Sequence, residues 1–117
     1  MGKSNFKPGI TINFREGCIS IGKDVIRALG GPEYISIMKN NEKKTLLIIP
    51  CGEYDPLSFR VPENFLNEYN KMFRIYSLQF TNEFRSEGGF NNENYVRLKG
   101  KYDEKMGSVV FEFETEE

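Results

Sequence analysis

The sequence predicts an α+β fold that is mainly β, built from two βαββ-like units within one compact domain. Short runs in which apolar and polar residues alternate, as they do in half-buried strands, recur along the 117 residues. In each half a helical stretch follows a strand and runs into a Gly-Gly pair, at 30–31 and at 88–89. Hydrophobic residues make up 38% and aromatic residues 14% of the chain, which is enough for a core and argues against disorder.

The first unit is expected to span residues 10–50. Its first two strands should form a hairpin around Arg15-Glu16-Gly17, and Gly30-Gly31-Pro32 should end its helix. A polar turn at 40–44 then joins two further strands, and Pro50 ends the second of them. The predicted elements are strands at 10–14, 19–21, 34–38 and 46–49, and a helix at 25–29.

The second unit is expected to span residues 73–113. A strand at 73–76 leads into a helix at 77–85, for which Ser77 is the expected N-cap, and strands at 95–98 and 109–113 follow. Between the units, residues 51–72 should form a connector with a short strand at 58–61 and, after Pro62, a short helix. Residues 1–9 are predicted to be a flexible arm and 114–117 an acidic tail.

The second unit repeats the order of the first: strand, helix, Gly-Gly break, hairpin. Tyr34 to Ile37 resembles Tyr95 to Leu98, and Leu46 to Ile48 resembles Val109 to Phe111. One unit of about 40 residues cannot bury its own apolar face, so two units packed together are the natural completion. The alternative is that the two halves share a common order of elements without being a duplication.

Charge is distributed unevenly along the chain, although the formal net charge is only −1. Residues 1–50 carry eight basic and four acidic residues, a net charge of +4, whereas residues 51–117 carry eight basic and thirteen acidic residues, a net charge of −5. A basic first half suits a polyanionic partner. A solvated surface followed by an acidic tail explains the same numbers.

Residues typical of catalytic and metal sites are scarce. The absence of histidine removes the commonest general base, Ser-His and Cys-His nucleophile pairs and most zinc sites. Cys18 and Cys51 are too far apart in sequence for a metal knuckle and are expected to be free thiols. No phosphate-binding glycine motif occurs. We therefore expect a protein that is not an enzyme, with no catalytic residues, no metal and no cofactor.

One set of positions in residues 10–50 forms a recognisable pattern: Gly17 in the turn, Ile19 and Ile21 in the strand, Lys23 and Arg27 on the helix, Leu29-Gly30 at its end, and Ile48-Ile49-Pro50 at the close. With this pattern, residues 10–50 resemble the swapped-hairpin domain of AbrB, SpoVT and MraZ type bacterial regulators, and 73–113 resemble a weaker second copy. The chain departs from the family at Cys18, where the family has arginine, and at Gly22, where it has proline.

The resemblance implies a pseudo-symmetric swapped-hairpin barrel that binds duplex DNA and regulates transcription. By position, Arg15, Lys23 and Arg27 would contact DNA, with Lys3 and Lys7 from the arm. The chain would be a monomer with a pseudo-dimer fold, or a homodimer. The alternative function is a protein–protein interaction module, antitoxin-like or accessory, that has lost DNA binding.

A second basic surface is predicted from spacing alone. Arg97, Lys99 and Lys101 recur at every second residue, so one strand would place them on a single face. A solvated outer face of the sheet explains the same row. No segment approaches the roughly 20 apolar residues of a membrane helix, and the first residues lack a signal-peptide core, so a cytoplasmic location without membrane contact is expected.

Overall fold

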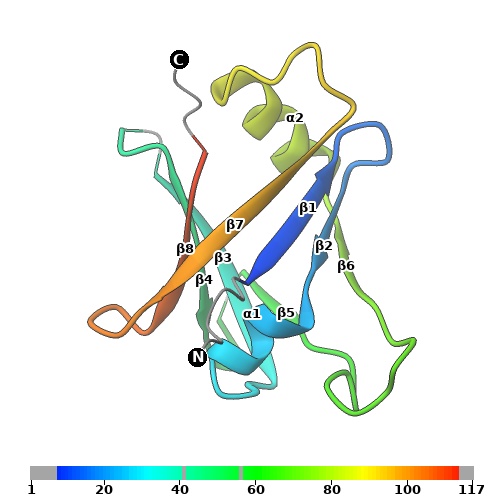
Figure 1. Cartoon of the computed structure of the whole chain (residues 1–117), viewed down its shortest axis with the longest axis vertical. Helices are drawn as coiled ribbons and strands as arrows, with labels where there is room; N and C mark the ends of the chain where they lie inside the picture. The colour runs from blue at the N-terminus through cyan, green and yellow to red at the C-terminus, as the bar shows by residue number, and fades with distance from the viewer. Residues whose placement is uncertain (1–7, 41, 56, 114–117) are drawn as a thin grey trace, which may run out of the picture.

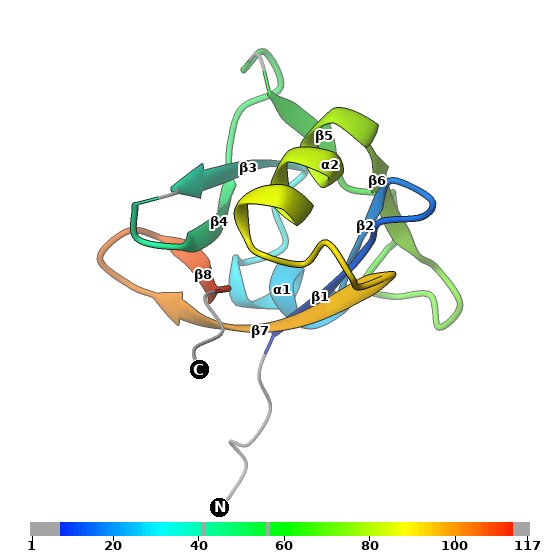
Figure 2. The same ribbon diagram turned by 90° about the horizontal axis from the view of Figure 1, so that it is seen from above.

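A computed structural model describes residues 8–40, 42–55 and 57–113. Within these residues, eight antiparallel strands form one sheet that curls into a nearly closed barrel, accompanied by two short helices (Figure 1). The strand order is β5-β3-β4-β8-β7-β1-β2-β6. Seen from above, β7, β1, β2 and β6 form one wall of the barrel and β3, β4 and β8 form the opposite wall (Figure 2). The mainly β prediction is therefore confirmed.

The elements predicted for the first unit are confirmed with small changes at their ends. Gly9 already belongs to the first strand, so it is not part of an arm, and residues 1–7 of that predicted arm lie outside the described residues. The elements are β1 (Gly9–Asn13), β2 (Cys18–Ile21), α1 (Lys23–Ala28), β3 (Tyr34–Asn40) and β4 (Thr45–Pro50).

The second half contains the expected strand, helix and hairpin, but its first long strand is longer than predicted. The predicted strand at 95–98 continues to Asp103, because Gly100 and the charged residues around it keep the alternation of buried and exposed positions. The predicted tail at 114–117 lies outside the described residues. The elements are β5 (Ser58–Arg60), β6 (Phe73–Tyr76), α2 (Leu78–Glu87), β7 (Tyr95–Asp103) and β8 (Ser108–Glu112).

The connector between β5 and β6 forms turns in place of the predicted short helix. Asn64 has a φ of 62°, in the left-handed region, which interrupts a right-handed helix two residues after Pro62. Only isolated turn bonds remain, such as that from the Phe65 amide to the Pro62 carbonyl at 3.1 Å. Phe65, part of the apolar spacing that suggested a helix, is instead buried in the core. The centre of its ring lies 5.8 Å from the centre of the Phe73 ring.

Three hairpins, β1–β2, β3–β4 and β7–β8, have four-residue turns of the same kind. In each, the residue before the turn is Asn or Asp, and its side-chain oxygen accepts a hydrogen bond from a turn amide at 2.9–3.3 Å. The last turn residue has a positive φ in all three. The residue before the turn and the last turn residue are Asn13 and Gly17, Asn40 and Lys44, and Asp103 and Gly107. The β5–β6 connection lacks this turn and runs from residue 61 to 72.

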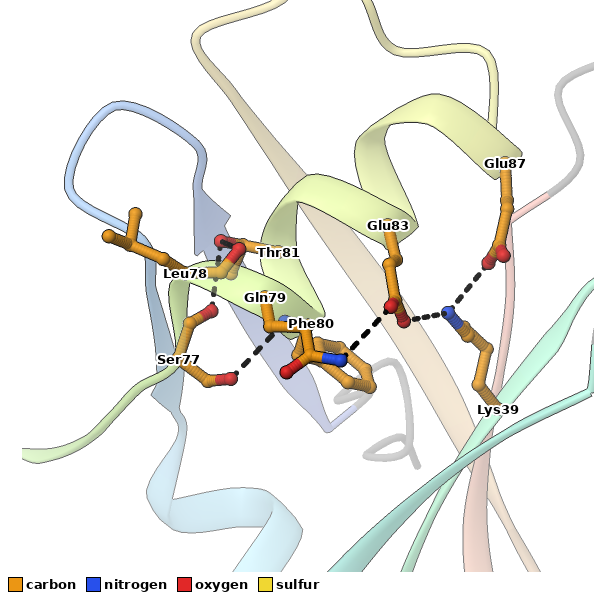
Figure 3. Close-up of polar contacts among 8 residues, drawn as sticks. All are labelled: Lys39, Ser77, Leu78, Gln79, Phe80, Thr81, Glu83 and Glu87. Carbon is orange, nitrogen blue, oxygen red and sulfur yellow. Dashed lines mark hydrogen bonds and ion pairs between the residues drawn. The ribbon is translucent and has the colours of Figure 1, made fainter.

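Helix α2 lies across one end of the barrel (Figure 2). Its Phe80 and Phe84 side chains pack against the core. Ser77 caps the helix as predicted, accepting from the Phe80 amide at 3.2 Å. Phe84 is fully buried, and the centre of its ring lies 4.7 Å from the centre of the Phe113 ring. Burial of one such ring contributes about 1.5–3 kcal/mol. At the end of β3, Lys39 binds Glu83 and Glu87 of α2, with Nζ–Oε distances of 3.6 and 2.6 Å (Figure 3).

Candidate nucleic-acid interface

The strand register brings two arginines from distant parts of the chain onto one outer surface. Thr11 of β1 pairs with Arg97 of β7 on one side and with Ser20 of β2 on the other, and Ser20 pairs with Arg74 of β6. These four outward side chains form one row across four neighbouring strands. At about 4.8 Å per strand, the two arginine backbones are about 14 Å apart. Between the arginines lie the small, half-buried hydroxyl side chains of Thr11 and Ser20.

The predicted row on β7 forms the second axis of this surface. Arg97, Lys99 and Lys101 are exposed and alternate with the buried Leu98 and Gly100, so all three point outward. Two strand residues advance about 6.7 Å, so the row extends over about 13 Å. We call Arg74, Arg97, Lys99 and Lys101 the basic face; it lies on the wall formed by β7, β1, β2 and β6 (Figure 1).

Two tyrosines border the basic face near the β1–β2 turn. Tyr95 is 52% exposed and Tyr76 is 64% exposed. They lie on the two strands that flank the β1–β2 hairpin, where Tyr95 of β7 pairs with Asn13 of β1 and Tyr76 of β6 pairs with Cys18 of β2. The Arg97 guanidinium carbon lies 5.7 Å from the centre of the Tyr95 ring, within the range of a cation–π interaction. Arginine and exposed aromatic rings together suit a surface that meets phosphates and bases.

The cations of the basic face are not neutralised by ion pairs among the described residues. The ion pairs found there involve Lys39, Lys71 and Arg27. Carboxylates nevertheless lie near both ends of the face. Glu112 lines a hollow of about 110 Å³ together with Lys99 and Lys101, and Glu16 lies beside the Cys18 thiol, on which the charge of Arg74 also acts.

The Cys18 thiol lies between Asn13 and Tyr76 and is 2% exposed. Burial raises its pKa above the ordinary value of 9.0, and the neighbouring Glu16 carboxylate raises it further, while Arg74 acts in the opposite direction. Both this thiol and Cys51 are free. The raised pKa keeps Cys18 protonated and weakly nucleophilic, so it contributes no reactive group to the face.

The structure separates the residues that the resemblance assigned to DNA. Arg15 is exposed in the β1–β2 turn, while Lys23 and Arg27 lie on α1 beyond the far end of β2, about 13 Å of strand away. The Lys23 ammonium donates to the Lys71 carbonyl at 2.8 Å and lies over the Phe65 ring at 4.6 Å. Lys3 and Lys7 lie outside the described residues.

The Arg27 side chain is 55% exposed and contacts Asp24 at 3.3 Å, so its charge is partly compensated on its own helix. The departure at Gly22 also has a local reason. The Gly22 amide donates to the Gly9 carbonyl at 3.1 Å, and any Cβ at Gly22 would stand 2.7 Å from that same oxygen. Proline would lose the hydrogen bond and bring in the clash.

Sequence reasoning missed Arg74. The alternation of Phe73, Arg74, Ile75 and Tyr76 was sufficient to place it on the outer side of a strand. Its place beside the first hairpin depends on the pairing of β6 with β2, across more than 50 residues of sequence. That pairing is a property of the tertiary fold and has no local signal.

The described residues offer little for other chemistry. Within the described ranges, no three side chains of His, Cys, Asp or Glu gather closely enough to hold a metal ion. In the same part of the chain, neither helix has the length and apolar character needed to cross a bilayer. Comparison of the chain with family models, curated proteins and solved structures gave no match.

Proposed function

We propose that this protein is a non-enzymatic regulator of the AbrB sort that binds duplex DNA through the basic face. The observation that carries the proposal is the row from Arg97 through Thr11 and Ser20 to Arg74, whose two arginines form no ion pair among the described residues. Cations bound to phosphates displace condensed counterions, and this supplies most of the affinity without requiring base contacts. Arg15, at the exposed end of the same hairpin, extends the surface.

Salt dependence provides the test. We expect micromolar binding of a random-sequence duplex at low salt, measured by fluorescence anisotropy, that collapses at moderate salt. The double variant Arg74→Ser with Arg97→Ser should weaken binding and reduce the slope of log K against log salt by about 0.9 for each phosphate contact removed.

The matched control removes two lysines from exposed hairpin turns, Lys43→Ser with Lys105→Ser, and so changes net charge equally. It should bind almost as the unmodified chain does. An equal loss in both double variants would show that only total charge matters. Failure of the unmodified chain to bind at low salt would end the DNA proposal and favour the protein-binding alternative.

We further propose that the barrel consists of two swapped-hairpin units within one chain. The proposed symmetry exchanges β1 with β5, β2 with β6, β3 with β7 and β4 with β8. Under this exchange each observed strand pairing corresponds to an observed pairing, and the β2–β6 and β4–β8 pairings correspond to themselves. The exception is the β1–β2 pairing, which has no β5–β6 counterpart. The β2–β6 and β4–β8 ladders each join two strands that the exchange interchanges, and Ser20 pairs with Arg74 in the first and Leu47 with Val110 in the second.

This arrangement predicts that one chain completes the barrel. Light scattering coupled to size-exclusion chromatography should give a mass near the 13.6 kDa of one chain. A stable mass of twice that value would instead support the homodimer, in which further surface is buried between copies.

A further inference from the structure

The barrel has a gap where its two edge strands, β5 and β6, do not meet. Each pairs with a single neighbour among the described residues, β5 with β3 and β6 with β2. An unpaired strand edge presents amide and carbonyl groups in the spacing that another strand needs. The gap therefore offers two such edges that face a common space.

An apolar groove of about 270 Å³ occupies this gap. Residues of both edge strands and of their neighbours form its floor, and α2 closes one end with Gln79, Phe80 and Glu83 (Figure 3). Leu57, just before β5, lines the groove and is 65% exposed, an unfavourable position for a leucine in water. The groove is lined by Ile19, Ile37, Leu57, Phe59, Ile75, Ser77, Gln79, Phe80 and Glu83.

Two arginines, one from each edge strand, lie on the outer side of the gap. Arg60 on β5 alternates with Phe59 and the buried Val61, and Arg74 on β6 alternates with the buried Phe73 and Ile75, so both arginines point outward and are exposed. In the two-unit arrangement proposed above, Thr11 corresponds to Arg60 and Ser20 corresponds to Arg74. Because Thr11 pairs with Ser20 in the β1–β2 ladder, the same register between β5 and β6 would set Arg60 directly opposite Arg74. Like charges in such a cross-strand pair disfavour direct closure of the barrel.

We propose that this groove binds an extended segment of a partner protein, which is inserted between β5 and β6 as a ninth strand. The segment would alternate apolar residues, directed into the groove, with acidic residues, directed outward to the two arginines. Main-chain hydrogen bonds to the free edges give affinity, and the apolar lining with the two arginines gives specificity. Outward acids on the inserted strand would also compensate the charges of Arg60 and Arg74.

The test uses the full chain as bait for a displayed library of random ten-residue segments. The enriched sequences should alternate apolar residues with Asp or Glu. Leu57→Glu should weaken their binding at least ten-fold, and the exposure of this side chain makes the substitution compatible with folding. The matched control is Met106→Glu, a 60% exposed apolar residue in the β7–β8 turn, which should leave binding unchanged.

Hydrogen exchange gives a second readout with an enriched peptide bound. The amides of β5 and β6 should gain protection, while those of β7 and β8 stay as in the free protein. Absence of enrichment, enriched sequences that bind Leu57→Glu equally well, or protection elsewhere would overturn the proposal. A self-association that Leu57→Glu abolishes would overturn it in favour of a second copy as the occupant. DNA binding by Leu57→Glu should be normal, so failure here is distinguishable from failure of the DNA proposal.

Discussion

The β3–β4 and β7–β8 hairpins have the same frame but are filled with different residues. Both have a four-residue turn, and both pair through one strand with the other hairpin. At inward positions that lie at the same distance from the turn, the first hairpin pairs Ile37 with Ile48, whereas the second pairs Gly100 with Phe111. Two medium side chains are thus replaced by one large ring opposite a glycine. The comparison teaches that the space between two paired strands of this barrel is filled from both strands in one hairpin and from a single strand in the other.

The turns differ in a related way. The last turn residue lies in the left-handed region in both hairpins, with φ of 53° at Lys44 and 62° at Gly107. Glycine adopts this conformation without a steric penalty, whereas lysine does not. Lys44 gains a compensating contact, because its ammonium donates to the Glu87 carbonyl of α2 at 3.1 Å. One turn is relaxed, and the other is strained but tied to a helix.

The largest effect is expected from Gly100→Ala. A Cβ there would stand 2.8 Å from the Phe111 ring and 2.8 Å from the Val110 carbonyl oxygen, and overpacking of this kind costs about 1–3 kcal/mol. Urea unfolding should show this loss, and adding Phe111→Ile should recover the part that comes from the ring. Gly9→Ala is the control, since its Cβ would meet only the Leu98 oxygen at 3.6 Å. Equal losses at Gly9 and Gly100 would contradict the argument that the Phe111 ring fills the space above Gly100.

An intermediate effect is expected when the turn residues are exchanged. Gly107→Lys should lower the free energy of unfolding by about 1–2 kcal/mol, because it places a side chain in the left-handed region. Lys44→Gly relieves that strain but loses the contact with Glu87, so its net change should be smaller than about 1 kcal/mol. Thermal or urea unfolding of both variants measures the difference. A similar loss of unfolding free energy in the two variants would contradict the argument that Lys44 is strained in its turn and Gly107 is not.

The smallest effect concerns the residue that follows each turn, which is Cys18 in the first hairpin and Ser108 in the last. Burial holds the folded pKa of Cys18 above its ordinary value of 9.0, with Glu16 adding to the effect. The stability that this provides is fully present below pH 9 and is lost as pH rises through the folded pKa. Cys18→Ser should flatten the alkaline decline in unfolding free energy. An unchanged slope above pH 9 would assign the decline to other groups, Cys51 among them.

Sequence periodicity was sufficient for most elements of the barrel. The Gly-Gly pairs ended both helices, Ser77 capped α2, and the alternation of Arg97, Lys99 and Lys101 placed them on one face. Local patterns failed where a single backbone angle decided the outcome, as at Asn64.

Local patterns also could not show which outer faces lie side by side. Arg74 joins the basic face only because β6 pairs with β2, and Arg15 is separated from α1 only because β2 lies between them. These are cross-strand relations between distant segments, for which propensity and spacing carry no information.

The strand order also has a consequence for how the chain folds. β1 pairs with β7, so Ile10 meets Leu98 across 88 residues, while the two open edges come from the middle of the sequence. At about 5–20 residues per second, a ribosome needs roughly 5–20 s to reach the end of β7 after it has completed β1. Throughout that interval one edge of β1 has no native neighbour, and pairing of such high contact order is slow even in the finished chain. The β1–β2 hairpin must therefore remain soluble with an open edge, which gives the alternation of Thr11 and Ser20 with buried isoleucines a role during synthesis.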